Sequence, residues 1–483
     1  MRILKLTFVQ ILFTTLTCMA QYPVGPDGYA CLGVLNGKQA SEIKSSTWSI
    51  GGETLDRDYA DYDSYKKYLG PLGAKRIRLQ GGWAKCEKVK GTYDFAWLDN
   101  IINDAISQGV QPWVELSYGN PAYEGGGEPK LGGSLPESEE ALKAWDNWVT
   151  AMAGRYKHKV TEWEIWNEPN LTPKITGKTY AVFYIRTVEI IKKIQPEARI
   201  MALSYAGVQS LGFLEAFFDI LKEKGKLHLV NTVTFHGYPD NPDNIYPPIE
   251  ILRDTVHRYA PGIKLMQGEN GCPSTPASNS VGALRRFDWT EFSQAKYVAR
   301  RLLGDYGRNI ETNLFTLSDL HYKQGDHLAG VNSKGLLKTH DDKTVDRPKL
   351  SYYTAQRIMG YFNADEVSRL SDDNTRLLEN TDKYSLFGFR HLRSALPVYA
   401  VWDHESRPAE SYRALSNTLV IEEKVPDPVY VDLLSGYVYA IPLKNVEYKG
   451  RQTIIKEIPL PDYPVLIGSK KSIPFSQKRY YLK

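Results

Sequence analysis

The stretch Glu162-Trp163-Glu164-Ile165-Trp166-Asn167-Glu168-Pro169-Asn170 decides the fold class of this chain. Its first residues alternate between carboxylates and large aromatic or β-branched side chains, which favour an extended strand. Pro169 ends the run, because proline cannot donate to a ladder of sheet hydrogen bonds. We therefore predict a short strand over Thr161–Trp166, with Glu168 on the turn at its exit.

Three similar β-rich runs precede this strand and four follow it. Amphipathic segments with helical periodicity separate the runs. The other predicted strands are Thr47–Ile50, Arg76–Leu79, Gln111–Leu116, Arg199–Leu203, Thr232–His236, Lys264–Gln267 and Asn313–Thr316. The predicted helices are Trp97–Ser107, Glu139–Arg155, Tyr180–Ile194, Leu211–Lys224, Ile249–Tyr259, Phe292–Tyr306 and Leu350–Met359. This alternation predicts an α/β fold, a (β/α)8 TIM barrel over residues 40–362.

A doubly wound open sheet is the alternative with the same alternation. Such a sheet normally carries a glycine-rich phosphate loop after its first strand. Gly51-Gly52-Glu53 follows the first predicted strand here and lacks that pattern. The barrel is therefore the preferred prediction.

The pattern changes after residue 362, where short alternating segments are separated by turn residues such as Ser435-Gly436 and Lys449-Gly450. Segments of this kind predict a smaller C-terminal β-sandwich domain over residues 363–483. Residues 21–39 fall outside the barrel alternation, and we expect this N-terminal segment to be able to contribute a strand to the β domain.

The first twenty residues are typical of a secretory signal peptide. Arg2 and Lys5 precede an apolar run, and small residues at Cys18 and Ala20 are suited to cleavage before Gln21. The run is too short for a membrane span, which needs about 20 apolar residues. We expect export through this signal peptide, to the periplasm or the medium. Lipoprotein anchoring at Cys18 is the less favoured alternative, because Thr17 fits a lipobox poorly.

Composition excludes several classes of protein. The 483 residues are 42% hydrophobic and 24% charged, as in soluble globular domains, and the net charge of +4 is dispersed along the chain. These values disfavour a nucleic-acid partner and a membrane span. Cys31, Cys86 and Cys272 form neither a disulfide framework nor a zinc pattern, so one bridge or three thiols remain open. No metal or cofactor is predicted, and the oligomeric state is unknown.

Two glutamates occupy the exits of predicted strands. Glu168 follows Thr161–Trp166, and Glu269 follows Lys264–Gln267. The carboxyl ends of all barrel strands meet at one face, so both carboxylates should lie in one mouth. Such a pair is what glycoside hydrolysis requires, with one group protonating the leaving oxygen while the other attacks or activates water. Glu164 is the nearest competitor, but it should lie deeper in the barrel.

The Trp-Asn-Glu-Pro-Asn motif at residues 166–170 resembles the acid/base motif of clan A glycoside hydrolases, and most of all that of glycoside hydrolase family 39, which includes β-xylosidases and α-L-iduronidases. The resemblance implies that Glu168 is the acid/base and Glu269 the nucleophile of a retaining double displacement. It also implies that Asn167 binds a sugar hydroxyl and that His236 and Tyr238 flank the nucleophile. The neighbours of Glu269 differ from the family's usual Thr-Glu-Phe context.

Further residues near strand ends are candidates for contact with substrate. Arg78, within Arg76–Leu79, is expected to keep the pKa of the nucleophile low. Aromatic residues near strand ends are able to stack on sugar rings, although burial in the core explains each of them equally well: Trp83, Trp113, Tyr118 and Tyr205. Asp319 and His321, after the last predicted strand, resemble a sugar-contacting pair of the family, with a plain surface pair as the alternative.

Two functions from different classes fit this pattern. The first is a retaining exo- or endo-glycosidase acting on an oligosaccharide or polysaccharide without a cofactor. The second is a non-catalytic carbohydrate-binding protein on a glycosidase-like barrel. The presence of both Glu168 and Glu269 favours the enzyme, because loss of activity usually removes one of them. The sequence does not identify the sugar or its anomeric configuration.

Overall fold

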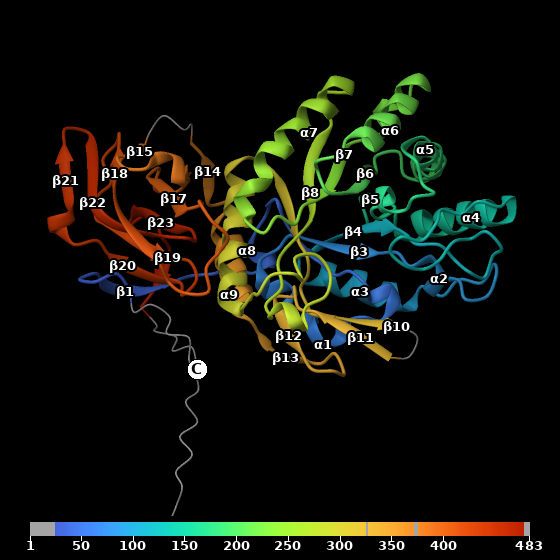
Figure 1. Cartoon of the computed structure of the whole chain (residues 1–483), viewed down its shortest axis with the longest axis horizontal. Coiled ribbons are helices and arrows are strands. Elements are labelled where there is room, and N and C mark those ends of the chain that lie inside the picture. Colours follow the sequence, from blue (N-terminus) through green and yellow to red (C-terminus); the bar gives the residue numbers. More distant parts are fainter. Residues whose placement is uncertain (1–24, 325–326, 371–374, 478–483) are drawn as a thin grey trace, which may run out of the picture.

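The computed structural model describes residues 25–324, 327–370 and 375–477. The predicted signal peptide, including Cys18, lies outside these residues. Within them the chain folds into a barrel of parallel strands and a smaller antiparallel β domain, which lie side by side (Figure 1).

The barrel is a closed sheet of eight strands in sequence order. Its strands are β2 (Trp48–Gly51), β3 (Arg76–Gln80), β4 (Gln111–Leu116), β5 (Glu162–Ile165), β6 (Arg199–Ala206), β7 (Thr232–His236), β8 (Lys264–Asn270) and β9 (Glu311–Leu314). Each strand is parallel to the next, and β9 pairs with β2 to close the sheet. The predicted barrel is confirmed.

Helices cover the outside of the barrel and connect its strands (Figure 1). They are α1 (Tyr62–Tyr65), α2 (Trp83–Cys86), α3 (Ala96–Ser107), α4 (Glu139–Tyr156), α5 (Gly177–Ile194), α6 (Gly212–Glu223), α7 (Tyr246–Tyr259), α8 (Glu291–Gly307) and α9 (Leu350–Tyr361). Side-chain caps explain where several of them begin. Ser138 accepts from the N–H of Ala141 at the start of α4, and Thr176 accepts from that of Thr179 at the start of α5.

Two small hairpins lie between β9 and α9, and the strand–helix alternation did not predict them. They are formed by β10 (Leu320–Gln324) with β11 (His327–Asn332) and by β12 (Leu337–Thr339) with β13 (Val345–Pro348). These strands are short and half exposed, so they lack a sustained hydrophobic pattern. The first hairpin is tied to the segment after β2 by the N–H of His321, which donates to the carbonyl of Tyr59 at 2.8 Å.

The C-terminal region packs two antiparallel sheets, and the predicted β-sandwich is confirmed. The larger sheet contains, in spatial order, β14 (Val367–Arg369), β16 (Tyr384–His391), β17 (Pro397–Asp403), β23 (Val465–Ser469), β19 (Pro428–Asp432), β20 (Tyr437–Ala440), β1 (Ala30–Leu35) and β24 (Phe475–Ser476). The smaller contains β15 (Thr375–Leu377), β18 (Ala414–Ile421), β22 (Gln452–Pro461) and β21 (Val446–Lys449). The strand from the N-terminal segment, β1, pairs with β20 in the larger sheet.

Helices α8 and α9 lie between the barrel and the β domain (Figure 1). From α8, the buried ammonium of Lys296 donates to Asp462 at 2.7 Å. From α9, the guanidinium of Arg357 donates to the backbone carbonyl of Leu434 at 2.5 Å. Buried charged groups of this kind need partners, and the β domain supplies them to these two helices.

None of the helices in the described residues is long and apolar enough to cross a membrane. Cys31, Cys86 and Cys272 are all free thiols, and the last two are buried.

Candidate active site

Glu168 lies on the turn that leaves β5, where the backbone is held in an unusual conformation. Trp166 and Glu168 both have positive φ angles, 64° and 47°. Such angles are unfavourable for side chains with a Cβ, so surrounding contacts must hold them. The N–H of Glu168 donates to the carbonyl of Ser204 on β6 at 3.1 Å, which fixes the turn against the neighbouring strand.

Glu269 lies near the end of β8, and three groups surround its carboxylate. Oε1 accepts from Arg78 on β3 at 2.5 Å, and Oε2 accepts from the hydroxyl of Tyr238, which follows β7, at 2.8 Å. Nδ1 of His236 is 3.4 Å from Oε2. One carboxylate oxygen of Glu168, one of Glu269 and a ring nitrogen of His236 all lie within 4.8 Å of one another, so the two carboxylates share one small site.

The surroundings of Glu269 favour its ionised form. Burial alone would raise the pKa of this carboxyl group, but the charges of His236 and Arg78 and the hydrogen bond from Tyr238 outweigh burial and lower it. Glu269 is therefore held as a carboxylate and aimed by two donors.

His236, at the end of β7, connects the two glutamates. Its Nδ1 is 2.8 Å from Oε1 of Glu168, and its Nε2 is 2.9 Å from Oγ of Ser204. Burial alone would lower the pKa of the imidazole, but Glu269 and Glu168 together raise it. The carboxylate pair thus favours the protonated form of His236, and the hydrogen bond between the ring and Glu168 holds Glu168 in position.

Arg78 is completely buried beneath the pair and binds four carboxylates. Besides Glu269, its guanidinium donates to Glu164 at 2.7 Å, to Glu53 at 3.2 Å and to Glu115. Burial, only partly offset by Arg78, raises the pKa of Glu53 to about 7 and that of Glu115 to about 8. Protons on these two groups reduce the negative charge around Arg78, which leaves its charge available to Glu269.

Asn167 is fixed by three polar neighbours. Its Oδ1 accepts from Arg78 at 2.9 Å and from the hydroxyl of Ser204 at 3.0 Å, and its Nδ2 donates to the hydroxyl of Tyr118 at 2.9 Å. The side chain is therefore oriented before any substrate binds. Glu164, the competing carboxylate, is fully buried and accepts from Arg78 and Thr234, so it lies beneath the site rather than in it.

Two of the aromatic candidates lie in the core. The Trp83 side chain is fully buried and stacks on Tyr123 with ring centroids 5.7 Å apart. Trp113 is also fully buried, and its Nε1 donates to Ser49 at 2.9 Å. The prediction that these two rings stack on sugars is wrong, because neither has an exposed face. Tyr205 is 2% exposed and donates to the carbonyl of Ser210, so it braces the segment after β6.

Asp319 and His321 are held by residues outside the carboxylate pair. Asp319 accepts from Lys349 at 2.7 Å, and Nε2 of His321 is 2.8 Å from the hydroxyl of Thr339. Both are buried, so the surface-pair alternative is wrong. Their observed contacts stabilise the hairpin segment after β9.

Several groups around the site did not emerge from the sequence. Glu53 follows β2, and Glu115 lies within β4, where a carboxylate in the apolar run Pro112–Leu116 was an available signal of a buried polar site. Lys334, after β11, is 3% exposed, and its Nζ lies 5.6 Å from the ring centroid of Tyr238. No sequence pattern pointed to Lys334, because the two hairpins on either side of it were not predicted.

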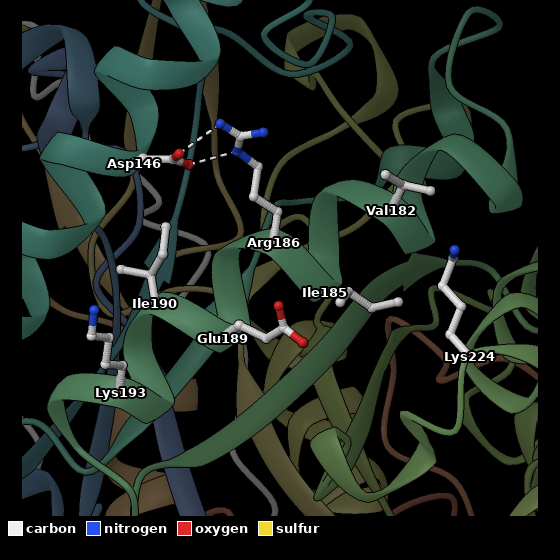
Figure 2. A pocket seen from close by; sticks show the side chains of 8 residues that line it. All are labelled: Asp146, Val182, Ile185, Arg186, Glu189, Ile190, Lys193 and Lys224. Atoms are coloured by element: carbon white, nitrogen blue, oxygen red, sulfur yellow. Dashed lines mark hydrogen bonds and ion pairs between the residues drawn. The ribbon is translucent and has the colours of Figure 1, made fainter.

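A separate depression lies on the outer helical surface of the barrel. Figure 2 shows it over α5, with Asp146 of α4 and Lys224, which directly follows α6, at its edges. Arg186 spans it in a two-bond ion pair with Asp146, with distances of 2.7 and 2.6 Å. Its lining includes neither Glu168 nor Glu269, so it is distinct from the strand-end site.

Part of the chain matches a known family of enzymes. Residues 69–251 match the family model of glycosyl hydrolases family 39. The match covers the barrel from before β3 into α7 and includes Arg78, Glu168 and His236. The resemblance to family 39 that the sequence motif indicated is confirmed.

One curated protein is similar to part of this chain. A curated β-xylosidase of Caldicellulosiruptor saccharolyticus is 29% identical over 156 residues, which are 28% of this chain and 31% of that protein. The chain thus spans about a third of the length of this curated relative.

Solved structures share the fold. A family 39 glycoside hydrolase from Bacteroides cellulosilyticus has a TM-score of 0.64 at 17% identity, over 90% of this chain and 83% of that one. A family 39 β-xylosidase from Caulobacter crescentus has a TM-score of 0.51 at 19% identity, over 83% and 82%. At these identities the likeness shows the architecture, a barrel with a β domain.

Proposed function

We propose that the protein is a retaining glycosidase that cleaves O-glycosidic bonds of an oligosaccharide or polysaccharide, with Glu168 as acid/base and Glu269 as nucleophile. The observation that carries this proposal is the placement of the two carboxylates. At least one oxygen of each lies within 4.8 Å of the other, a closeness that favours direct attack, for which carboxyl groups are typically about 5–5.5 Å apart, over attack through a water, for which they are roughly 6.5–9.5 Å apart. The β-xylosidase relative makes xylosides the first substrates to test.

The proposed reaction has two steps. In the first, the Glu269 carboxylate attacks the anomeric carbon while Glu168 donates its proton to the departing oxygen, which gives a covalent glycosyl-enzyme. In the second, Glu168 takes a proton from water, and the water oxygen displaces Glu269 with a second inversion. Arg78 and Tyr238 hold Glu269 ionised and aimed. Asn167 is placed to bind the sugar hydroxyl beside the reacting carbon.

Rescue by azide tests both roles. Glu269→Ala should lower kcat on a 4-nitrophenyl glycoside by about 10⁴-fold or more, because the attacking group is lost. Azide occupies the space left by the carboxylate and should restore turnover, giving a glycosyl azide of inverted configuration. Glu168→Ala should instead yield an azide of retained configuration, because Glu269 still attacks first.

The converse outcomes contradict the proposal. Wild-type protein that binds glycans but hydrolyses no activated glycoside would indicate the non-catalytic carbohydrate-binding alternative. Azide products with the opposite assignments would exchange the roles of Glu168 and Glu269.

The pH–rate profile gives a second test of Glu168. We expect a bell-shaped profile whose alkaline limb reflects loss of the Glu168 proton. Glu168→Gln should abolish that limb on substrates with good leaving groups, and its persistence would contradict the assignment.

The carboxylate oxygens of Glu168 and Glu269 and the ring nitrogen of His236 also lie close enough together to bind one cation. The proposed reaction uses no metal, so activity should be unchanged after dialysis against EDTA. Loss of activity that is restored by a divalent ion would contradict the mechanism.

We further propose that the protein is exported, because residues 1–20 have the order of charged, apolar and small residues that signal peptidase recognises. Expression in a bacterial host should give a mature N-terminus at Gln21 in the periplasm or medium, as read by N-terminal sequencing. A Cys18→Ala variant that changes the fraction bound to membranes would instead indicate lipid anchoring.

A further inference from the structure

Three lysines of the described residues are buried, and two of them are fully paired. Lys296 donates to the carboxylate of Asp462 and to two backbone carbonyls. Lys349 donates to the carboxylate of Asp319, to a serine hydroxyl and to a carbonyl. Both ammonium groups thus use all three donors, which is what burial of a charge normally requires.

Lys334 differs from them. Its Nζ makes one long hydrogen bond, 3.3 Å to Oδ1 of Asn332, and no ion pair with any residue that the structure describes. Burial lowers the pKa of this ammonium to about 8, although the nearby Cys272 and Glu269 oppose that shift. Lys334 is therefore a buried cation with two unused donors.

The position of Lys334 places those donors beside the reacting carboxylates. Nζ lies 5.6 Å from the centroid of the Tyr238 ring, and the hydroxyl of Tyr238 binds Glu269. Asn332 also donates to the hydroxyl of Tyr322, and the pKa of that phenol is raised by burial and by the charges of Glu269 and Glu168. Tyr322, Asn332 and Lys334 therefore lie along one wall of the same site.

The segment that follows β8 also passes close to Lys334. A Cβ placed on Gly282 would lie 3.2 Å from Nζ, so the backbone of this segment approaches the ammonium closely. An unpaired buried charge does not stabilise the folded protein. The charge is explained if a ligand supplies the missing anion.

We propose that Lys334 binds an anionic substituent of the substrate sugar, a carboxylate or a sulfate ester. This inference rests on the proposed glycosidase function and adds the substrate class. An ammonium with two free donors beside a sugar site matches the oxygens of such a group. Lys334 is then a specificity-determining residue, and neutral sugars leave its charge without a partner.

Matched substrates test the proposal. Wild type, Lys334→Met and Lys334→Arg are assayed on 4-nitrophenyl xylosides, glucosides, glucuronides and 6-sulfated glucosides of both anomeric configurations. Wild type should prefer an acidic member, and Lys334→Met should lower the ratio of acidic to neutral kcat/KM by about 100-fold. Lys334→Arg should retain part of that ratio. Lys338→Met, which removes an exposed lysine on β12, is the control and should leave the ratio unchanged.

Other results separate this inference from the proposed function. An enzyme that hydrolyses neutral glycosides, with a ratio insensitive to Lys334→Met, overturns the inference and leaves the function standing. A uniform loss on acidic and neutral substrates, with the acid limb of the pH profile displaced, would show that Lys334 acts through Glu269 and also overturns it. The sulfated and carboxylated substrates show which anion is bound.

Binding tests the inference even if no glycoside is hydrolysed. Titration calorimetry with glucuronate, glucose 6-sulfate and glucose should show an acidic preference that Lys334→Met removes. Equal binding of acidic and neutral sugars by wild type would overturn the inference. Thermal unfolding checks the fold: Lys334→Met should match or exceed wild type because it removes an unpaired buried charge, whereas Lys349→Met should be less stable.

Discussion

Arg78 sets the charge of the candidate site at the scale of single residues. One buried guanidinium contacts Glu53, Glu115, Glu164 and Glu269, and four full negative charges around it would repel one another. The raised pKa values of Glu53 and Glu115 relieve this repulsion by keeping protons on them. Their neutrality allows Glu269 to remain ionised beside the same arginine.

Replacement of Glu115 by Gln should reveal this proton. The folded protein holds a proton on Glu115 up to a pKa of about 8, whereas the unfolded chain releases it near 4.5. Between these values unfolding releases a proton, so the free energy of unfolding falls as pH rises. Glutamine carries no such proton, so the stability of Glu115→Gln relative to wild type should increase from pH 5 to pH 8, as measured by urea unfolding.

A stability difference that is the same at both pH values would contradict the raised pKa of Glu115. A difference that decreases toward pH 8 would show that the side chain is ionised and needed as an anion.

Removal of the Tyr238 hydroxyl should move the acid limb of the pH–rate profile. The nucleophile must be ionised, so activity rises with pH through the pKa of Glu269, which burial would raise but His236, Arg78 and the Tyr238 hydroxyl together lower. Tyr238→Phe loses one of these contributions and should shift the acid limb of kcat/KM upward by about one pH unit. Tyr361→Phe removes a comparable buried hydrogen bond to the Ser472 carbonyl and is the control. If the acid limb of Tyr238→Phe stays at the wild-type pH, the Tyr238 hydroxyl does not contribute to the ionisation of Glu269.

At the scale of elements, the exits of β5, β7 and β8 assemble the site. Each strand ends within reach of its neighbour, so Glu168, His236 and Glu269 converge although they are far apart in sequence. The packing between strands is tight here, because a Cβ on Gly268 of β8 would lie 3.2 Å from the His236 ring.

Gly268→Ala should therefore displace His236 and, with it, disturb the arrangement of Glu168 and Glu269. His236 is held between Glu168 and Ser204 and has no free direction in which to yield, so we expect kcat to fall by about tenfold or more. Gly154→Ala in α4 is the matched control, since nothing lies within 4 Å of its added Cβ. It should leave kcat unchanged and stabilise the protein by about 0.5–1 kcal/mol. Equal kcat values for the two variants would show that the β7–β8 packing does not position His236.

Elements with a strong period were predictable, and those without one were not. All eight barrel strands were predicted within a few residues of their observed ends because β-rich runs alternate with amphipathic helices. The hairpins β10–β11 and β12–β13 were missed because half-exposed strands of three to six residues carry little periodicity. Lys334 lies between these two hairpins, so it was missed together with them.

At the scale of the whole molecule, the β domain and the barrel share buried charges. Lys296 of α8 binds Asp462 and the carbonyls of Ala409 and Ser411, all from the C-terminal region. Arg300, one turn further along α8, donates to the carbonyls of Ser406 and His404. We therefore expect the two domains to unfold together.

Lys296→Met should test this coupling. It leaves the buried carboxylate of Asp462 without its cation, which typically costs about 3–5 kcal/mol in the free energy of unfolding. The loss should appear in a single transition seen both by calorimetry and by tryptophan fluorescence. Lys383→Met removes an exposed lysine of the β domain, paired with Glu405, and should leave stability close to wild type. Two separate transitions would show that the domains unfold independently.

Across the whole molecule, the sequence located the two carboxylates but not the burial or the partners of other residues. Glu168 was found from its motif and Glu269 from its place at a strand end, because barrel topology brings all strand exits to one face. Burial was not readable: Trp83 and Trp113 lie near strand ends but pack into the core. The pairing of Asp319 with Lys349 was also hidden, because it depends on the packing of the hairpins against α9.

The configuration of the product tests the central claim most directly. The glycoside that wild type hydrolyses fastest is followed by proton NMR from the first seconds, before mutarotation mixes the anomers. Direct attack by Glu269, which has an oxygen within 4.8 Å of one of Glu168, predicts that the first sugar released has the same anomeric configuration as the substrate. A first product of inverted configuration would contradict the account.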